Sequence, residues 1–153
     1  MKVKVYAKSR VDISAAIGAY AYILDDMAVQ ISNAAPFKHM PIKTMAQADC
    51  AAYVNALSIL SQHAVAPEVT ELEIITDSGV VYDLLDTYKA QKHCEEIARW
   101  WREKVKPVFV GIKEIKIIKI DRKLIAGDPK SFNIHKCDTM AGGALQTQRD
   151  KFR

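Results

Sequence analysis

Hydrophobic and polar positions alternate along the first part of the chain with the period of β-strands. Residues 2–8 place valines and an alanine on one side and lysines and a tyrosine on the other, which predicts a half-buried strand. The Ile- and Tyr-rich segment 16–24 predicts a second strand, and the Asp-Asp pair after it favours a turn into a third strand over 27–33. The chain therefore opens with a predicted three-stranded meander.

The rest of the chain shows longer apolar periods and helix-capping residues. After a loop over 37–43, Thr44 and Gln47 have capping-box spacing and predict a long helix that ends near Gln62. An apolar strand is predicted over 69–76, followed by a helix over 79–89 that Ser78 caps and a second helix over 95–104. An isoleucine-rich strand over 113–120, a loop over 121–132 and a last helix over 133–148, with a candidate cap at Asn133, come after them. The order βββαβα(α)βα predicts an α/β fold in which helices cover both faces of a mixed five-stranded sheet.

Composition narrows the class of protein. The chain has 153 residues, of which 50% are hydrophobic and 26% are charged, with six glycines and five prolines. These values exclude collagen-like, low-complexity and wholly disordered chains. They fit one domain over 1–148 with a basic tail over 149–153.

The apolar stretches and the cysteines predict the cellular compartment of the protein. Every apolar stretch is shorter than the roughly 18 residues of a membrane span, and the first residues form no apolar signal core, so we expect a cytoplasmic protein without membrane contact. Cys50, Cys94 and Cys137 are widely spaced and odd in number, which favours small core residues over a disulfide framework or a zinc site.

The formal net charge is only +4, but the charges are unevenly distributed. Residues 44–88 carry seven acids and no Lys or Arg, whereas residues 89–123 carry eleven basic residues and five acids. The first segment suits bound cations and the second suits polyanions. Both patterns also fit the solvated faces of ordinary helices and strands, so charge leaves the two explanations open.

Three aspartates fall where the predicted elements would bring them to one edge of the sheet. Asp49 lies on a largely apolar stripe of the first helix, Asp77 follows the central strand, and Asp138 lies in the first turn or two of the last helix. Carboxylates so close repel one another unless Mg²⁺, a proton or a basic side chain lies among them. Taken singly, each also has a structural explanation, as a surface residue, a helix cap and a partner of the helix dipole, in that order.

Four segments carry a resemblance to a known family. They are 18–24 (GAYAYIL), 48–57 (ADCAAYVNAL), 74–78 (IITDS) and 135–141 (HKCDTMA). In this order they resemble ribonuclease H of the type that cuts RNA in RNA/DNA hybrids, over nearly the whole chain. The resemblance implies an RNase H-like fold, with Asp49, Asp77 and Asp138 as catalytic residues that hold Mg²⁺ or Mn²⁺ in an active enzyme.

The fourth acid of that family is missing from the first strand. Where the family has a pattern like Tyr-Thr-Asp-Gly-Ser, residues 6–10 are Tyr-Ala-Lys-Ser-Arg, with Lys8 at the Asp position. The missing carboxylate bridges both metals in such sites, and an ammonium would repel them. We therefore expect Lys8 to modify the site as a built-in counter-ion among the three aspartates. Asp12, four residues later, is a candidate replacement acid.

Other positions also depart from the family's pattern. The glycine-rich turn after the first strand is replaced by residues 11–16, which contain no glycine. Met45 and Ala46 replace an asparagine pair that contacts the hybrid. The loop before the last helix lacks its histidine, with Asp128 near that position and His135 closer to the helix.

Basic and aromatic residues after the second helix are candidate nucleic-acid contacts. Basic side chains pair with phosphates, and an exposed aromatic ring stacks on a sugar or base. Their position resembles the basic helix and loop with which some ribonucleases H hold the hybrid. The alternative is that one tryptophan packs into the core and the charges only solvate a helix. The candidates are Lys89, Lys92, Arg99, Trp100, Trp101, Arg102, Lys104 and Lys106.

The sequence leaves three hypotheses for function. The first is an RNase H-like protein associated with RNA/DNA hybrid or double-stranded nucleic acid, whose own endonuclease activity is weak or lost because of Lys8. The second is a non-catalytic binding or assembly module for nucleic acid or a protein partner. The third is an active nuclease completed by Asp12 or by a partner subunit. Mg²⁺ or Mn²⁺ belongs to an active form, and otherwise we expect no cofactor.

Overall fold

A computed structural model describes residues 1–26, 29–38, 40–123 and 125–151 of the chain. Within these residues, the strands and α-helices follow one another in the predicted order. The strands are β1 (Lys2–Asp12), β2 (Ile17–Asp25), β3 (Gln30–Pro36), β4 (Glu71–Thr76) and β5 (Glu114–Lys119). The α-helices are α1 (Met45–Gln62), α2 (Gly79–Thr87), α3 (Glu95–Trp100) and α4 (Pro129–Asp150).

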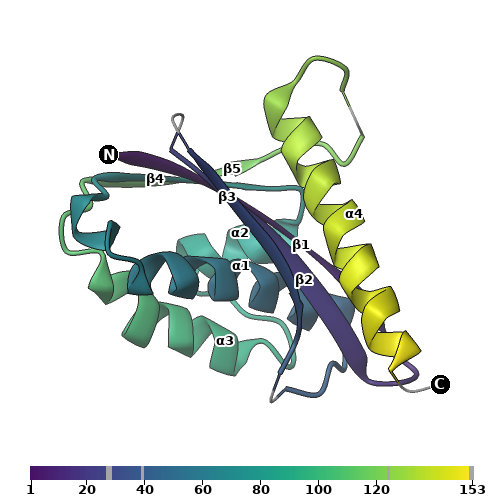
Figure 1. The fold of residues 1–153 in the computed structure, drawn as a ribbon. Helices are drawn as coiled ribbons and strands as arrows, with labels where there is room; N and C mark the ends of the chain where they lie inside the picture. Colours follow the sequence, from purple (N-terminus) through teal and green to yellow (C-terminus); the bar gives the residue numbers. More distant parts are fainter. Residues whose placement is uncertain (27–28, 39, 124, 152–153) are drawn as a thin grey trace.

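The strands form one mixed sheet in the order β3-β2-β1-β4-β5 (Figure 1). β1 pairs antiparallel with β2 and parallel with β4, and β5 pairs parallel with β4. The first strand therefore lies at the centre of the sheet, with neighbours on both sides. The predicted mixed five-stranded sheet is confirmed.

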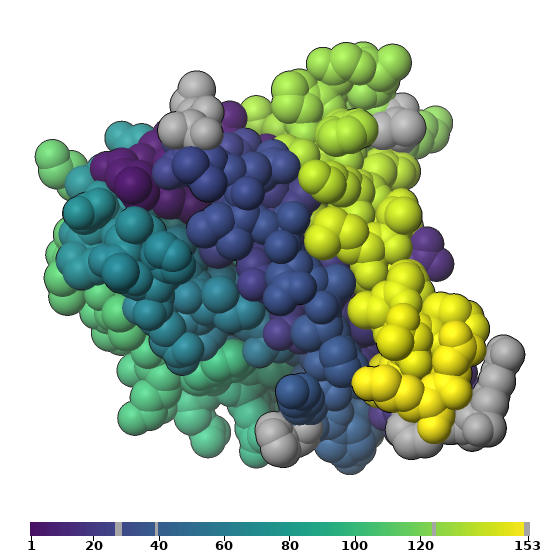
Figure 2. Space-filling view, viewed as in Figure 1, coloured from purple at the N-terminus to yellow at the C-terminus, as the bar shows by residue number. Residues whose placement is uncertain are grey.

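Two hydrophobic cores lie on opposite faces of the sheet. On one face, α1, α2 and α3 cover a large core that includes Val3, Val5 and Ala7 of β1. On the other face, α4 covers a smaller core that includes Tyr6 of β1 and Cys137 of α4. Successive side chains of a strand point to opposite faces, so β1 contributes alternately to the two cores. Figures 1 and 2 show α4, in yellow, along the side of the molecule away from α1 and α3.

Two of the predicted helix caps, Thr44 and Ser78, are present. The Thr44 hydroxyl accepts a hydrogen bond from the backbone N–H of Gln47 at 3.0 Å, and Ser78 accepts one from Val81 at 3.3 Å. Each bond satisfies a backbone donor that the first turn of a helix leaves without a partner. Ser78, and not Asp77, is therefore the cap of α2. None of the helices in the described ranges is long and apolar enough to cross a membrane.

Several element boundaries differ from the prediction. β1 continues to Asp12, which was predicted to lie beyond the strand, because its last residues pair with the start of β2. β3 runs over Gln30–Pro36, whereas it was predicted over 27–33, of which 27 and 28 lie outside the described residues.

The start and end of α4 also differ from the prediction. The helix begins at Pro129 and not at Asn133, since the Asp128 carboxylate accepts from the Lys130 backbone N–H and proline suits the first helical position. Its end at Asp150 places the first two residues of the predicted basic tail inside the helix.

Candidate functional site

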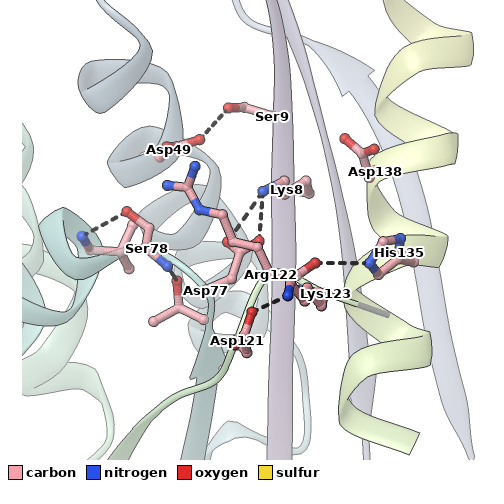
Figure 3. A network of polar contacts seen from close by, with 12 residues as sticks. Lys8, Ser9, Asp49, Asp77, Ser78, Asp121, Arg122, Lys123, His135 and Asp138 are labelled. Carbon is pink, nitrogen blue, oxygen red and sulfur yellow. Dashed lines mark hydrogen bonds and ion pairs between the residues drawn. The ribbon is translucent and has the colours of Figure 1, made fainter. Parts of the chain in front are cut away.

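The three aspartates come from three elements and lie around the second half of β1 (Figure 3). Asp49 is in α1, Asp77 follows β4 directly, and Asp138 is in α4. Asp138 lies about two and a half turns into its helix, because the helix starts earlier than predicted. The predicted interaction of Asp138 with the helix N-terminal dipole is therefore wrong, since that effect fades within the first turn.

Asp77 pairs with Lys8. The Lys8 Nζ lies 2.9 Å from Oδ2 and 3.2 Å from Oδ1 of Asp77, and the two side chains are 23% and 8% exposed. The parallel register places Tyr6 opposite Ile75, so two residues further along each strand Lys8 and Asp77 lie side by side on the α4 face. A nearly buried carboxylate is thus neutralised by a cation from the neighbouring strand.

The end of β4 that carries Asp77 is fixed by polar contacts. The Tyr53 hydroxyl of α1 donates to the backbone carbonyl of Ile75 inside the core. The Ser78 backbone N–H donates to the Thr76 hydroxyl at 3.0 Å. These bonds hold the backbone on both sides of Asp77, which fixes the direction of its carboxylate.

Asp49 has a neutral partner instead of a direct ion pair. Its Oδ1 accepts a hydrogen bond from the Ser9 hydroxyl at 2.7 Å. Burial raises the pKa of Asp49 above its ordinary value of 3.8, and the Ser9 hydrogen bond and the nearby charge of Lys8 only partly offset that rise. The Asp77 charge raises the pKa of Asp49 further, which indicates that the two carboxylates interact.

Asp138 forms a two-point ion pair with Arg10. Nε and a terminal nitrogen of Arg10 each lie 2.7 Å from one oxygen of the carboxylate, the paired geometry that Arg favours. The Arg10 hydrogen bonds lower the pKa of Asp138, and the charges of Lys8 and His135 add to this effect. Arg10 is 52% exposed and Asp138 is 29% exposed, so water screens this pair more than it screens Lys8 and Asp77.

A further cation comes from the loop after β5. Figure 3 shows the Arg122 guanidinium pointing toward Asp49, and its charge lowers the pKa of that carboxyl. The backbone carbonyl of Arg122 lies 3.2 Å from Nε2 of His135, which ties the loop to α4. Arg122 was not among the predicted site residues, because it lies in a segment predicted only as a loop.

These residues do not fit a divalent metal ion. Two of the three carboxylates already bind cationic side chains. In the part of the chain that the structure describes, no group of three or more His, Cys, Asp or Glu side chains is placed to hold a metal. Asp12, the candidate replacement acid, accepts from Ser14 at 2.7 Å and pairs with Arg149 at 3.3 Å.

The candidate nucleic-acid contacts fall into two groups. Lys89, Lys92, Arg99, Arg102 and Lys104 are exposed. Trp100 is half-buried against the core, but Trp101 is fully buried and its ring N–H faces the Leu85 carbonyl at 3.4 Å. The prediction of Trp101 as a nucleic-acid contact is therefore wrong, because its ring has no exposed face. The alternative, in which one tryptophan packs into the core, is correct for Trp101.

The two tryptophans differ in burial because neighbouring residues of a helix point about 100° apart. After Trp100, α3 continues as a π-helical turn over Trp101–Val105, which buries both ends of that turn and exposes the charged residues between them. A π turn adds a residue to the helix and shifts the direction of the side chains that follow.

Two hollows separate α3 from the segment that leads into α1. One has a volume of about 470 Å³ and is lined by Gln47, Lys92 and His93, among others. The second has a volume of about 400 Å³ and is lined by Trp100 and Tyr20, among others. Both include Met40 and Ile97, so together they run along the side of α3 that carries Trp100.

Comparison with solved structures identifies the fold. RNase H1 from the archaeon Halobacterium salinarum has a TM-score of 0.66 and 16% identity, over 96% of this chain and 99% of that one. LC11-RNase H1, isolated from compost, has a TM-score of 0.70 and 14% identity, over 96% of this chain and 97% of that one. The same enzyme in complex with an RNA/DNA hybrid has a TM-score of 0.66 and 14% identity, over 95% of this chain and 98% of that one. No protein-family model and no curated protein sequence matches the chain.

Proposed function

We propose that this chain, which has the RNase H fold, binds RNA/DNA hybrid or another nucleic-acid duplex, and that its own metal-dependent cleavage is weak or lost. One observation carries the proposal: the ammonium of Lys8 lies 2.9 Å from the carboxylate of Asp77, where an RNase H would place a further acid. The resemblance of the fold to RNase H1 structures, one of them solved with a hybrid, supports the duplex as the ligand.

Electrostatics explain why Lys8 opposes cleavage. A divalent ion held about 4 Å from an ammonium is repelled by on the order of 8 kcal/mol at the effective dielectric constant of a partly exposed site. Asp77 and Asp138 would also have to exchange their present ion pairs for the metal. A metal would therefore have to displace two side-chain cations before it could activate water.

The exposed basic residues before, on and directly after α3 supply the proposed binding surface. Their cationic groups can contact phosphates, and phosphate contacts of this kind release counterions from the duplex. We propose that Trp100, the half-buried ring beside this set, contacts a sugar or base next to the contacted phosphates. The basic set is Lys89, Lys92, Arg99, Arg102 and Lys104.

A restoration experiment tests the loss of cleavage. Labelled RNA/DNA hybrid is incubated in Mg²⁺ or Mn²⁺ with the parent, Lys8→Asp, and Lys8→Asp combined with Arg10→Ser, which matches the family's Asp-Gly-Ser pattern at both outer positions. We expect the parent to cut no faster than the background without protein, and the double variant to cut at least about 10-fold faster than that background. Cutting by the parent at a rate equal to that of the double variant would contradict the proposal.

The matched control for this experiment is Lys151→Asp. It makes the same change of charge as Lys8→Asp, but about 20 Å further along α4 from Asp138. The control should leave cutting at the parent's level. Cutting restored equally by Lys151→Asp would show that total charge, and not the charge at Lys8, sets the activity.

A binding experiment tests the duplex. The dissociation constant of the parent for RNA/DNA hybrid is measured from about 50 to 200 mM salt, where several phosphate contacts should weaken it by 10-fold or more. Lys92→Ala combined with Arg99→Ala should reduce the salt slope by about 1 for each phosphate that is no longer neutralised, whereas Lys151→Ala should not. A folded parent that binds no duplex at low salt would contradict the proposal and favour a module that binds a protein.

A further inference from the structure

The two edge strands of the sheet differ in charge. β5, at one edge, carries Glu114, Lys116 and Lys119 among its six residues, and charges of this kind discourage pairing with a further strand. β3, at the other edge, has seven residues, and none of them is charged. Its one proline, Pro36, is the last residue of the strand. β3 therefore has neither the charges nor the internal proline that usually protect an edge strand.

Alternate residues of β3 turn their backbone groups outward. The Phe37 backbone N–H donates to the Gly18 carbonyl of β2 at 2.9 Å, and in an antiparallel pair this direction alternates from one residue to the next. Every second residue before Phe37 therefore points its N–H and carbonyl away from β2. In agreement, the outward Ala34 N–H donates to the side-chain oxygen of Asn33 at 2.8 Å and not to a strand. The outward donors are Gln30, Ser32 and Ala34.

The first half of this edge lies on the surface. Gln30, Ile31, Ser32 and Asn33 are all exposed. Figure 2 shows the blue residues of β3 on the surface of the molecule, beside α4 in yellow. In Figure 1 the strand likewise faces the viewer, with α4 to one side of it. A further strand could therefore reach the outward backbone groups.

We propose that β3 pairs antiparallel with β3 of a second copy of this chain, which joins two five-stranded sheets into one continuous sheet around a two-fold axis. With Ser32 at the axis, Ser32 pairs with Ser32 of the second copy and Gln30 pairs with its Ala34. Residues paired in this way exchange both backbone hydrogen bonds, so the contact gains about six of them. A two-fold contact closes at two copies. This inference is independent of the proposed function, because it concerns only the edge of the sheet.

The charges at the two ends of β3 favour this partner and this direction. Asp25 and Asp26 precede the strand, and Lys38 follows it. Antiparallel pairing brings the acidic start of each strand toward the basic end of the other, whereas parallel pairing would bring like charges together. The strand is thus complementary to itself in charge as well as in backbone hydrogen bonding.

Apolar side chains near the axis would also be covered. Val29 is 59% exposed and Ile31 is 40% exposed. Ile31 lies on the α1 face, like its β2 partner Leu24. In a pairing centred on Ser32, Ile31 lies opposite Asn33 of the second copy and diagonal to its Ile31, close enough for contact between the side chains. The pairing would therefore remove apolar surface from water.

Sedimentation velocity tests the association. The parent is measured from about 5 to 500 µM, a range that suits a small and weak contact. We expect the mass to rise with concentration from 17.1 kDa toward twice that value and to stop there. A mass that stays at the monomer value, or that grows past the dimer, would overturn the proposal.

Two variants at the axis test the role of the strand edge. Ser32→Pro removes an outward N–H without loss of a bond to β2, and Ser32→Lys places two like charges opposite each other. Each should weaken the dimer by about 10-fold or more. The matched control is Thr87→Lys, which adds the same charge at the exposed end of α2 and should leave the dimer unchanged. Equal weakening by Thr87→Lys would show that net charge, and not the β3 edge, controls the association.

Hydrogen exchange locates the contact in the parent itself. The Gln30 and Ser32 amides should exchange several-fold more slowly at high than at low protein concentration, because the dimer gives them acceptors. The amides of β5 should show no such change. A dimer in which Ser32 exchanges equally fast at both concentrations would place the contact elsewhere and overturn the proposal. Because this measurement needs no variant, poor folding of Ser32→Pro would not prevent the test.

Discussion

The two faces of β1 give neighbouring carboxylates different partners. On the α4 face, Lys8 and Arg10 give cations to Asp77 and Asp138. On the α1 face, Ser9 gives only a hydroxyl to Asp49. The pKa of Asp138 is accordingly lowered, mainly by Arg10, whereas that of Asp49 is raised, mainly by burial. Because successive side chains of β1 point to opposite faces, one strand can give neighbouring carboxyl groups pKa shifts of opposite sign.

The difference shows that proximity alone does not define a metal site. In the sequence, three acids predicted to meet beside β1 look like the ligands of a metal ion. Whether they can bind one depends on the charges that already lie beside each carboxylate. On the α4 face, Asp77 and Asp138 each contact a cationic side chain directly. On the α1 face, Asp49 is influenced only at longer range, by the charges of Lys8 and Arg122. The contrast can be tested one carboxylate at a time.

Removal of the Lys8 ammonium should have the largest effect. Lys8→Ala leaves Asp77 nearly buried without its cation, so we expect the free energy of unfolding to fall by roughly 2 to 4 kcal/mol in metal-free buffer. The measurement is urea unfolding with a chelator present. Added Mg²⁺ should recover part of the loss, since Asp77 would then gain another counter-ion.

A double variant isolates the charge of this pair. Lys8→Ala combined with Asp77→Asn should be less destabilised than the sum of the two single variants, because the uncompensated charge is gone. Lys151→Ala is the control and should change stability by less than about 0.5 kcal/mol. Unchanged unfolding of Lys8→Ala in metal-free buffer would contradict the counter-ion role.

Loss of the Arg10 pair should have a smaller effect. Arg10→Ala is expected to lower stability at pH 7 by about 1 kcal/mol, because both side chains are partly exposed and the pair is screened. A lowered carboxyl pKa adds stability above the unfolded value of about 3.8 and loses it as the pH falls through the folded value. Unfolding curves of parent and variant should therefore differ at pH 7 and converge below pH 3.8. A difference that persists at pH 2 would assign the effect to packing.

The smallest effect should have the opposite sign. Asp49→Asn keeps an acceptor for Ser9 and removes a charge that burial disfavours, so stability at pH 7 should rise by up to about 1 kcal/mol. Since the folded pKa of Asp49 lies above 3.8, the parent regains this stability as the pH falls through that folded value. The gain should therefore disappear below pH 3.8. Destabilisation of Asp49→Asn at pH 7 would show that the charge itself stabilises the fold.

Much of the fold could be predicted because it rests on local signals. The alternation in β1 and the caps Thr44 and Ser78 each depend on a few neighbouring residues, and the structure contains all of them. The early start of α4 was missed, because Asp128 and Pro129 together begin a helix more strongly than Asn133 does. The burial of Trp101 was also missed, although Ile97, Trp101 and Val105 are four residues apart, which is the spacing of one helix face, and all three are buried.

The site could be predicted only in part. The order of elements brought the three aspartates to the region around β1, and the departure at Lys8 was visible in the sequence. The pairing of Arg10 with Asp138 was not, because it depends on which way two side chains 128 residues apart point across the α4 face. Alternation from Lys8 would have placed Arg10 on the same face, and this signal was available but unused.

The partners in the central ion pair, Lys8 and Asp77, are 69 residues apart, and they meet only when β1 aligns parallel with β4. Contacts between distant segments require costly loop closure, so we expect this one to form after the folding transition state. Lys8→Ala would then leave the refolding rate nearly unchanged and accelerate unfolding by roughly 30-fold or more, which stopped-flow chevron plots would reveal. The ammonium would thereby prolong the lifetime of the native state without guiding the chain toward it.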